Sequence, residues 1–201
     1  MEGVIVAGGH STRFGEADKA VADLAGTPMI RRVADRLAGV VDTLVVNCRT
    51  EQVDPIGAAM DGYEHDVRFA EDSEPDQGPM AGIRTGLRAV DAEYAVVVAC
   101  DMPFVDPVLV AHLCERAAGR DAAVPRIEEW FQVTHAVYRA ESMADACDRA
   151  LDRDERRIVA PLDDLDYVVV EESEIREYAA LRTFENVNTR EELEEAEALL
   201  S

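Results

Sequence analysis

The chain has 201 residues, of which 48% are hydrophobic, so it is long enough to bury one domain core and too apolar to be disordered. Asp and Glu number 42 against 20 Lys plus Arg, and the formal net charge of −22 repels nucleic acids and anionic membranes. No apolar run reaches the roughly 18 residues that a membrane helix needs, and the first residues lack the basic region of a signal peptide. The composition therefore predicts a cytoplasmic protein with no nucleic-acid or membrane partner.

Three further features of the composition are informative. The acidic residues are spread along the whole sequence, which predicts a halophilic protein whose self-repulsion is screened in a salt-rich cytoplasm. Lys19 is the only lysine among the 20 basic residues, so this position needs a specific reason. The four cysteines stand far apart without metal-ligand spacing, which predicts buried free thiols.

The predicted elements alternate between strands and helices. Residues 3–7 form an apolar run that ends in glycines, typical of a buried parallel strand leading into a turn. The pattern then predicts a helix over 28–37, strands over 41–46 and 67–70, a helix over 81–89, a central strand over 94–99 and a helix over 107–117. Strands over 122–125 and 133–138, a helix over 142–151 and a strand over 167–170 follow, and a capping box at residues 189–192 starts a last helix. This order predicts a single three-layer α/β domain over residues 1–201, with a mostly parallel sheet.

The first strand runs into the glycine loop Ala7-Gly8-Gly9, and Arg13 and Lys19 follow it. Glycines let the backbone approach phosphates closely and point its N–H groups at them. Arg13 and Lys19 would add cationic contacts to a polyphosphate, Lys19 as a compact point charge. The loop matches neither a Walker P-loop nor GxGxxG, and a plain turn would not explain the single lysine. The pattern therefore predicts a phosphate-binding loop.

Asp101 directly follows the central strand, within Cys100-Asp101-Met102-Pro103. A carboxylate at this end of a strand is suited to Mg²⁺, which takes one or two carboxylates plus substrate oxygens. The alternative is that Asp101 caps the helix starting at residue 107, but Asp106 is better placed for that task. Asp101 is therefore the predicted metal ligand.

Two other strand-end loops carry polar residues. Asp72 follows the third strand, and the Gly78-Pro79 turn leads into a helix containing Gly82, whose N-terminal N–H groups suit an anion or a base. Plain turn chemistry explains this loop equally well. Asn186 and Asn188 alternate and so project to the same side with amide donors and acceptors, although they also fit a turn into the last helix.

These segments, in this order, resemble the molybdenum cofactor guanylyltransferase family, which belongs to the nucleotidyltransferases that begin with a Gly-Gly loop. The similarity runs from Gly3 to the last helix, and Cys-Asp-Met-Pro together with Asn-Val-Asn-Thr is its most specific part. One position departs, because this chain has Ala136 where the family usually has proline. The other matching residues are Asn47, Asp72, the Gly-Pro-Met-Ala-Gly stretch at 78–82, residues 135–139, Arg156 and Arg157.

The resemblance implies a Rossmann-like nucleotidyltransferase fold, Mg²⁺ as cofactor, and a role for each matching residue. Asn47 and Asp72 would contact the nucleoside, and Asp101 would hold both magnesium and nucleotide. The catalytic residues would be Lys19, Asp101 and Arg13. The GTP-binding residues would be Val6, Ala7, Gly8, Gly9, Lys19, Asn47, Asp72 and Asp101, and the acceptor-binding residues Gly78, Pro79, Gly82, Asn186 and Asn188. Cofactor-insertion proteins and molybdoenzymes are the implied protein partners.

The chemistry expected from the residues is in-line attack of an acceptor phosphate on the α-phosphate of a nucleoside triphosphate, with release of pyrophosphate. The resemblance makes the nucleotide GTP, the acceptor Mo-molybdopterin and the product the guanine dinucleotide form of the cofactor. Gly9 would leave room for a purine where related cytidylyltransferases commonly carry a larger residue. Two alternatives are a guanylyltransferase for another phosphorylated precursor such as cobinamide phosphate, and a GTP-binding module without turnover.

Overall fold

The computed structural model describes residues 1–9, 18–72 and 77–200, and a large sheet forms the centre of this part of the chain. The sheet has eight strands among the described residues, in the order β10-β7-β9-β6-β1-β4-β5, with β8 beside β7. These strands are β1 (Glu2–Val6), β4 (Thr43–Cys48), β5 (Asp66–Glu71), β6 (Tyr94–Ala99), β7 (Ala122–Ile127), β8 (Trp130–Phe131), β9 (His135–Arg139) and β10 (Tyr167–Glu171).

The strand directions bring several loops to one edge of the sheet. β1 is parallel to both β4 and β6, and β5 is parallel to β4, so the carboxyl ends of these four strands share an edge. β9 runs antiparallel to β6 and β7, whereas β10 is parallel to β7. In the register, Val6 lies opposite Asn47 on one side and Ala99 on the other. The segments after β1, β4 and β6 therefore start at the same level.

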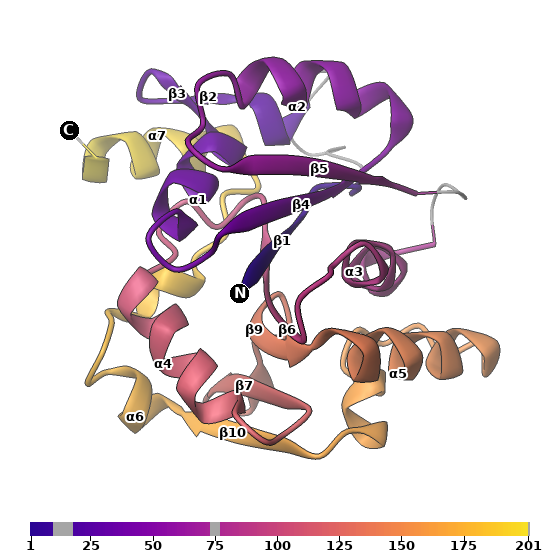
Figure 1. The fold of residues 1–201 in the computed structure, drawn as a ribbon. Helices are drawn as coiled ribbons and strands as arrows, with labels where there is room; N and C mark the ends of the chain where they lie inside the picture. Colours follow the sequence, from indigo (N-terminus) through magenta and orange to yellow (C-terminus); the bar gives the residue numbers. More distant parts are fainter. Residues whose placement is uncertain (10–17, 73–76, 201) are drawn as a thin grey trace.

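Helices cover both faces of the sheet, as predicted. α1 (Met29–Leu37), α2 (Val53–Ala59) and α4 (Pro107–Ala117) pack on one face, and α3 (Pro79–Arg88) and α5 (Ala140–Asp152) lie side by side on the other (Figure 1). The alternation of strand side chains produces these two cores: Ile5 belongs to the first and Val4 to the second. The three-layer α/β fold is thus confirmed.

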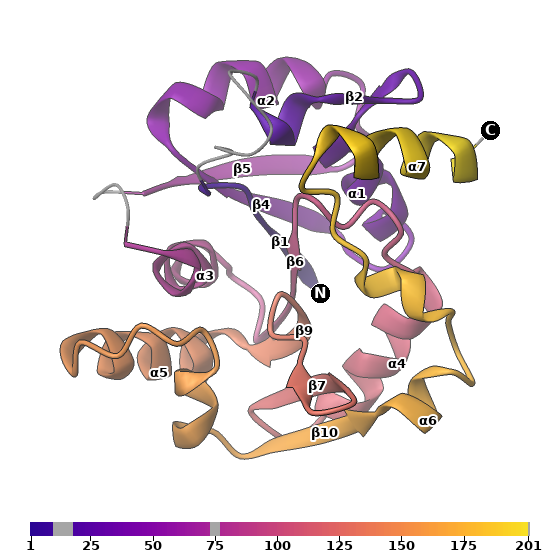
Figure 2. The ribbon, with the colours of Figure 1, turned by 180° about the vertical axis from the view of Figure 1, so that it is seen from behind.

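The C-terminal helix closes one side of the molecule. α7 (Arg190–Leu200) packs near the small hairpin of β2 (Asp23–Leu24) and β3 (Thr27–Pro28), and a third apolar cluster fills the contact (Figure 2). Leu24, Phe104, Val187 and Ala196 belong to this cluster, and each is at most 7% exposed. Residues just before α7 are thereby fixed against the segment that follows β6.

Several local predictions are confirmed in atomic detail. The Thr189 hydroxyl accepts from Glu192 N at 3.1 Å, and the Glu192 carboxylate accepts from Thr189 N at 3.0 Å, which is the predicted capping box. Asp106 caps α4 by accepting from Val108 N at 2.9 Å. Cys48, Cys100 and Cys147 are buried free thiols, and Cys114 is half-buried. No helix in the described part of the chain is long and apolar enough to cross a membrane.

Three predictions need correction. The second strand begins at Thr43 and ends at Cys48, so Asn47 lies inside the strand and not after it. The strand predicted over 133–138 starts at His135 and runs antiparallel, and Ala136 is buried in it opposite Val97, so the departure from the family pattern falls within the sheet. Elements that the pattern did not predict are α2, β2, β3, β8, α6 (Glu172–Ile175) and the 3-10 helices η1 (Lys19–Val21), η2 (Thr50–Gln52), η3 (Ala160–Asp164) and η4 (Leu181–Phe184).

Candidate active site

An ion pair between Lys19 and Asp101 lies at the carboxyl edge of the sheet. Lys19 Nζ is 2.5 Å from Asp101 Oδ2 and 2.7 Å from Asn188 Oδ1, and the other Asp101 oxygen accepts from Asn186 Nδ2 at 3.0 Å. The side chains of Lys19 and Asp101 are each 13% exposed. Four residues that the sequence singled out in three separate motifs therefore meet in one polar cluster.

The backbone fixes this cluster from both sides of Asp101. Val187 N donates to Asp101 O at 2.9 Å, which ties the asparagine segment to the loop after β6. Cys100 N donates to Val6 O at 3.1 Å, which ties the same loop to the end of β1. Lys19 is held by the turn of η1, which Asp18 caps by accepting from Ala20 N at 3.0 Å. The ammonium and the carboxylate thus meet through backbone geometry and not through long flexible loops.

The glycine loop has its carbonyl groups occupied by side chains. Ala7 N continues the β1–β4 pairing by donating to Asn47 O at 2.8 Å. Arg49 Nη1 donates to Gly8 O at 3.0 Å and to Gly9 O at 2.9 Å. The N–H groups of Gly8 and Gly9 donate to no described residue. The loop is therefore restrained through its carbonyls, and its N–H groups stay available to an anion.

Gly8 lies directly above a buried amide–carboxylate pair. Asn47 is fully buried, and its Nδ2 donates to Asp72 Oδ1 at 2.7 Å and to Ala70 O at 3.1 Å. A Cβ added to Gly8 would overlap Asp72 Oδ2, and one added to Gly82 would overlap Asn47 Oδ1. A side chain at either glycine would therefore displace Asp72 or Asn47, and Asp72 lies against the loop.

The other residues predicted for acceptor binding lie at the start of α3. Gly78 is the N-cap of this helix with a φ of +81°, and Pro79 is its first residue. Both are exposed, whereas Gly82 is buried. The predicted acceptor contacts of all three stay predictions, as do the assigned roles of Asn186 and Asn188. Arg13 lies outside the described residues.

Sequence reasoning missed Gln52, which connects both sides of the glycine loop. Its side chain is 1% exposed, and its Nε2 donates to Ala7 O at 3.1 Å and to Asp18 Oδ2 at 2.7 Å. Its Oε1 accepts from Arg49 N at 2.9 Å. Gln52 and Arg49 follow the carboxyl end of β4, and this position at the ligand-binding edge was the available signal.

Comparison with known proteins decides the family. The MobA-like NTP transferase domain matches residues 3–166. A probable molybdenum cofactor guanylyltransferase of Natronomonas pharaonis is 55% identical over 199 residues, which cover 99% of this chain and 98% of the relative. The chain belongs to the molybdenum cofactor guanylyltransferase family. The resemblance inferred from the motifs is thereby confirmed.

More distant relatives show how far the fold extends. A probable molybdenum cofactor guanylyltransferase of Methanosarcina mazei is 39% identical over 95% of this chain and 87% of the relative. The crystal structure of molybdopterin-guanine dinucleotide biosynthesis protein A from Archaeoglobus fulgidus has a TM-score of 0.81 at 29% identity, covering 100% of this chain and 98% of that one. A 2-C-methyl-D-erythritol 4-phosphate cytidylyltransferase from Thermus thermophilus has a TM-score of 0.71 at 19% identity, covering 99% of this chain and 98% of that one, so the two chains share a fold.

Proposed function

We propose that this protein transfers GMP from GTP to the terminal phosphate of Mo-molybdopterin, releasing pyrophosphate and forming the guanine dinucleotide form of the cofactor. The observation that carries the proposal is the cluster of Lys19, Asp101, Asn186 and Asn188 beside the glycine loop. It stands in a chain that belongs to the family of that activity. The proposal assigns the nucleotide to the loop side of the cluster and the acceptor to the asparagine side.

The residues support an in-line displacement in which the protein positions the reacting phosphates and neutralises their charge. The N–H groups of Gly8 and Gly9 would bind phosphate oxygens, since their carbonyls are already held by Arg49. Lys19 would exchange its contact with Asp101 for the triphosphate, because an ammonium is attracted most strongly to the nearest accumulation of negative charge. The acceptor phosphate then attacks the α-phosphate, and the oxygen bridging to the β-phosphate leaves with pyrophosphate. This scheme needs no covalent intermediate on the protein.

The same cluster fits a magnesium ion. Asp101 Oδ2 and Asn188 Oδ1 both point at the Lys19 ammonium, so two oxygen ligands already converge on a positive charge. No group of three or more His, Cys, Asp or Glu side chains suited to a metal is present among the described residues. Mg²⁺ commonly takes one or two carboxylates and completes its coordination with substrate oxygens and water. Asp101 would hold the ion, which when bound would neutralise charge on the reacting phosphates.

Asp101→Asn tests the metal assignment. The substitution keeps the shape of the side chain and removes the charge that a hard cation needs, so Mg²⁺-dependent turnover should be lost. Loss of the largely covered ion pair with Lys19 should lower the melting temperature as well, with the variant still folded at the assay temperature. Turnover of the variant and the wild type should be compared across a Mg²⁺ titration, with circular dichroism as the control for folding. Normal turnover at ordinary Mg²⁺ would place the metal elsewhere.

Base choice tests the guanylyl assignment. A Cβ added to Gly9 would meet no described atom within 4 Å, which agrees with space for a purine there. The Asp72 carboxylate beside Gly8 is an acceptor suited to the N–H groups of guanine. A base that leaves two such groups unpaired would cost on the order of 1–3 kcal/mol for each, so GTP should be preferred over CTP by roughly a hundredfold or more.

The experiment is a competition between GTP and CTP with Mo-molybdopterin as acceptor, in which the two dinucleotide products are counted by mass spectrometry. A parallel reaction with cobinamide phosphate tests the other acceptor class, and pyrophosphate release in each reaction reports turnover. Equal amounts of the two dinucleotide products would contradict the guanylyl assignment. Binding of GTP without release of pyrophosphate would contradict the proposal that the protein is an enzyme.

A further inference from the structure

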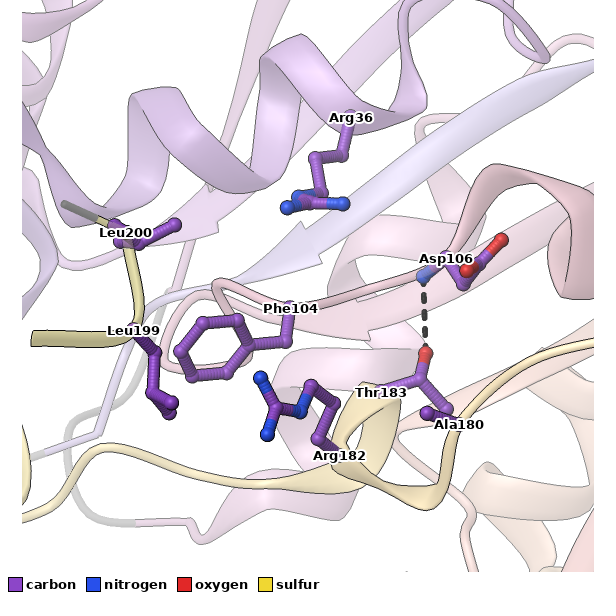
Figure 3. A pocket seen from close by; sticks show the side chains of 8 residues that line it. All are labelled: Arg36, Phe104, Asp106, Ala180, Arg182, Thr183, Leu199 and Leu200. Atoms are coloured by element: carbon purple, nitrogen blue, oxygen red, sulfur yellow. Dashed lines mark hydrogen bonds between the residues drawn. The ribbon is translucent and has the colours of Figure 1, made fainter. Parts of the chain in front are cut away.

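A small cavity lies behind the loop that carries Asp101. It has a volume of about 150 Å³, is open to solvent on one side, where Arg36 and Arg182 are exposed, and is lined by α1, the turn after β6, η4 and the end of α7 (Figure 3). Phe104 forms its centre, Arg36 and Arg182 reach in, and Leu199 and Leu200 line one side. Its wall thus combines apolar surface with two guanidinium groups.

The two arginines come from separate elements and line the same cavity. Arg36 projects from α1 and Arg182 from η4, and Figure 3 shows them on opposite sides of Phe104. The guanidinium carbon of Arg182 lies 5.8 Å from the centroid of this ring. Both guanidinium groups therefore line the same cavity, with Phe104 beside them.

These two arginines differ from almost every other arginine of the described chain in having no polar partner. Neither Arg36 nor Arg182 makes an ion pair or a hydrogen bond with a described residue. The other described arginines except Arg190 all donate to a carboxylate or a carbonyl group. In a chain with 42 acidic residues, these two guanidinium groups therefore remain without a carboxylate although acidic side chains are abundant.

The acidic residue in the cavity wall does not neutralise them. Asp106 uses its carboxylate to cap α4 at Val108 N, 2.9 Å away, and its own N–H donates to the buried Thr183 hydroxyl at 2.9 Å. It pairs with neither Arg36 nor Arg182. The cavity consequently keeps a net positive charge inside a protein of net charge −22.

We propose that this cavity binds a small phosphate-type oxyanion between Arg36 and Arg182. A guanidinium group presents a planar fork of donors that matches two oxygens of such an anion, and two forks from different elements can hold one anion together. The volume is well below the roughly 300 Å³ at which pockets for larger organic ligands begin, so it suits an inorganic anion.

Such an anion would link segments that belong to the candidate active site. Phe104 lies in the loop that starts with Asp101, and Arg182 lies in η4, directly before the asparagine segment. An anion bridging α1 and η4 would restrain both segments and remove the repulsion between the two arginines. We therefore expect anion binding to stabilise the folded protein, since any ligand that binds only the folded state does so.

The test measures the melting temperature of the full chain against inorganic phosphate, with the ionic strength held constant by KCl. Phosphate should raise the wild-type melting temperature above that in KCl alone. Arg36→Gln and Arg182→Gln should each lose most of this increment, because each removes one fork and Arg36 has no polar contact to disturb. Arg190→Gln is the matched control, since Arg190 also lacks a polar partner yet does not line the cavity, and it should keep the full increment.

The glycine loop is a second place where phosphate can bind, and Lys19→Gln separates the two sites. A response that persists in Lys19→Gln and disappears in both cavity variants supports the proposal. A response that disappears only in Lys19→Gln, or one that is equal in all variants, overturns it, as does the absence of a phosphate increment in the wild type. None of these outcomes depends on turnover, so the cavity and the proposed activity can fail independently.

Discussion

The ammonium of Lys19 occupies a position that a larger cation would not fit. It is in contact with one carboxylate and one amide oxygen at 2.5 and 2.7 Å, and its side chain is almost completely covered. A guanidinium is planar, broader and requires its donors in one plane. This geometry gives a physical reason why lysine persists at this single position of an otherwise arginine-based chain.

Lys19→Arg should therefore reduce turnover by on the order of a hundredfold although the charge is kept, which is the usual cost of losing one transition-state contact. The rate of pyrophosphate release at saturating GTP measures the effect. The opposite exchange at an exposed site, Arg190→Lys, should leave the rate unchanged. Near-normal turnover of Lys19→Arg would show that the lysine is not required for its shape.

Gln52 is expected to position the glycine loop, and a one-atom substitution can test this. In Gln52→Glu a carboxylate would face Ala7 O and the Asp18 carboxylate, so both contacts become repulsive and the loop loses its tie to the Lys19 segment. Each lost buried hydrogen bond costs about 1–3 kcal/mol, and part of that cost should appear as weaker GTP binding. The dissociation constant for GTP should rise at temperatures where the variant is still folded.

The rescue variant distinguishes positioning from general stability. Adding Asp18→Asn to Gln52→Glu restores a donor–acceptor pair with reversed polarity, and GTP affinity should partly return. A purely structural role would lower the melting temperature and leave the affinity of the folded protein intact. That outcome would contradict the assignment of Gln52.

Only part of the candidate site can be predicted from sequence. Asp101 stands directly after the most apolar strand, and Lys19 is the only lysine in the chain, so both residues can be identified as candidates from the sequence. Gln52 lies in the stretch Arg49-Thr50-Glu51-Gln52, which has the composition of a solvated loop. Its buried side chain contacts Ala7 O and the Asp18 carboxylate, both more than 30 residues away in the sequence, and no local pattern encodes those contacts.

For the strand β9, the hydrophobic pattern predicts that a strand exists but not in which direction it runs. Its apolar residues predict a strand, but alternation is the same for either strand direction. The connection from β7 through β8 is too short for a crossover, which takes a dozen or more residues, so the chain must return antiparallel. Connection length was therefore the missing argument. α2 escaped prediction for a different reason, because Pro55 and Gly57 give its seven residues poor helix propensity.

β9 also contains a buried histidine whose titration should be visible in the stability of the protein. His135 is fully buried, its Nδ1 lies 3.2 Å from Thr183 O, and burial lowers its pKa from 6.5 to about 4. In the unfolded chain the imidazole takes up a proton near pH 6.5, whereas the folded protein resists it until about pH 4. The stabilising effect is thus complete above pH 6.5 and is lost as the pH falls toward 4.

The measurement compares wild type with His135→Gln, whose side chain does not titrate. The free energy of unfolding of the wild type should fall by about 3 kcal/mol more than that of the variant between pH 7 and pH 4. The difference between the two proteins isolates the histidine from the many carboxylates that titrate in the same range. A difference independent of pH would mean that the pKa of His135 is the same in the folded and the unfolded protein.

The molecule as a whole carries far more acid than its arginines can neutralise. Ion pairs connect most of the described arginines to carboxylates, yet 42 acidic residues face 20 basic ones. The three-layer core that composition and alternation predicted must therefore form against the repulsion between acidic side chains on the surface. This repulsion acts over long distances, so ion pairs between neighbouring residues do not remove it.

Added KCl should raise the melting temperature, because the screening length falls from about 10 Å at 0.1 M to about 3 Å at 1 M salt. Thermal unfolding should be followed from dilute to molar KCl, with sorbitol at matched osmolarity as the control for water activity. A flat or falling curve would show that the excess of acidic residues has no stabilising response to salt. The net charge of −22 would then need another explanation.

The hydrogen bond between Lys19 and Asn188 also determines how late in its synthesis the chain can complete the candidate active site. The two residues are 169 positions apart, and Asp101 lies between them in sequence. While the ribosome is still translating the region before residue 186, the nascent chain can already hold the glycine loop, β6 and Asp101, yet the asparagines are missing. A ribosome-bound intermediate would thus lack the contacts of both asparagines with Lys19 and Asp101, and closing so long a loop is among the slow steps of folding. Competence for transfer should therefore appear abruptly, late in elongation, and not grow in proportion to the length of chain made.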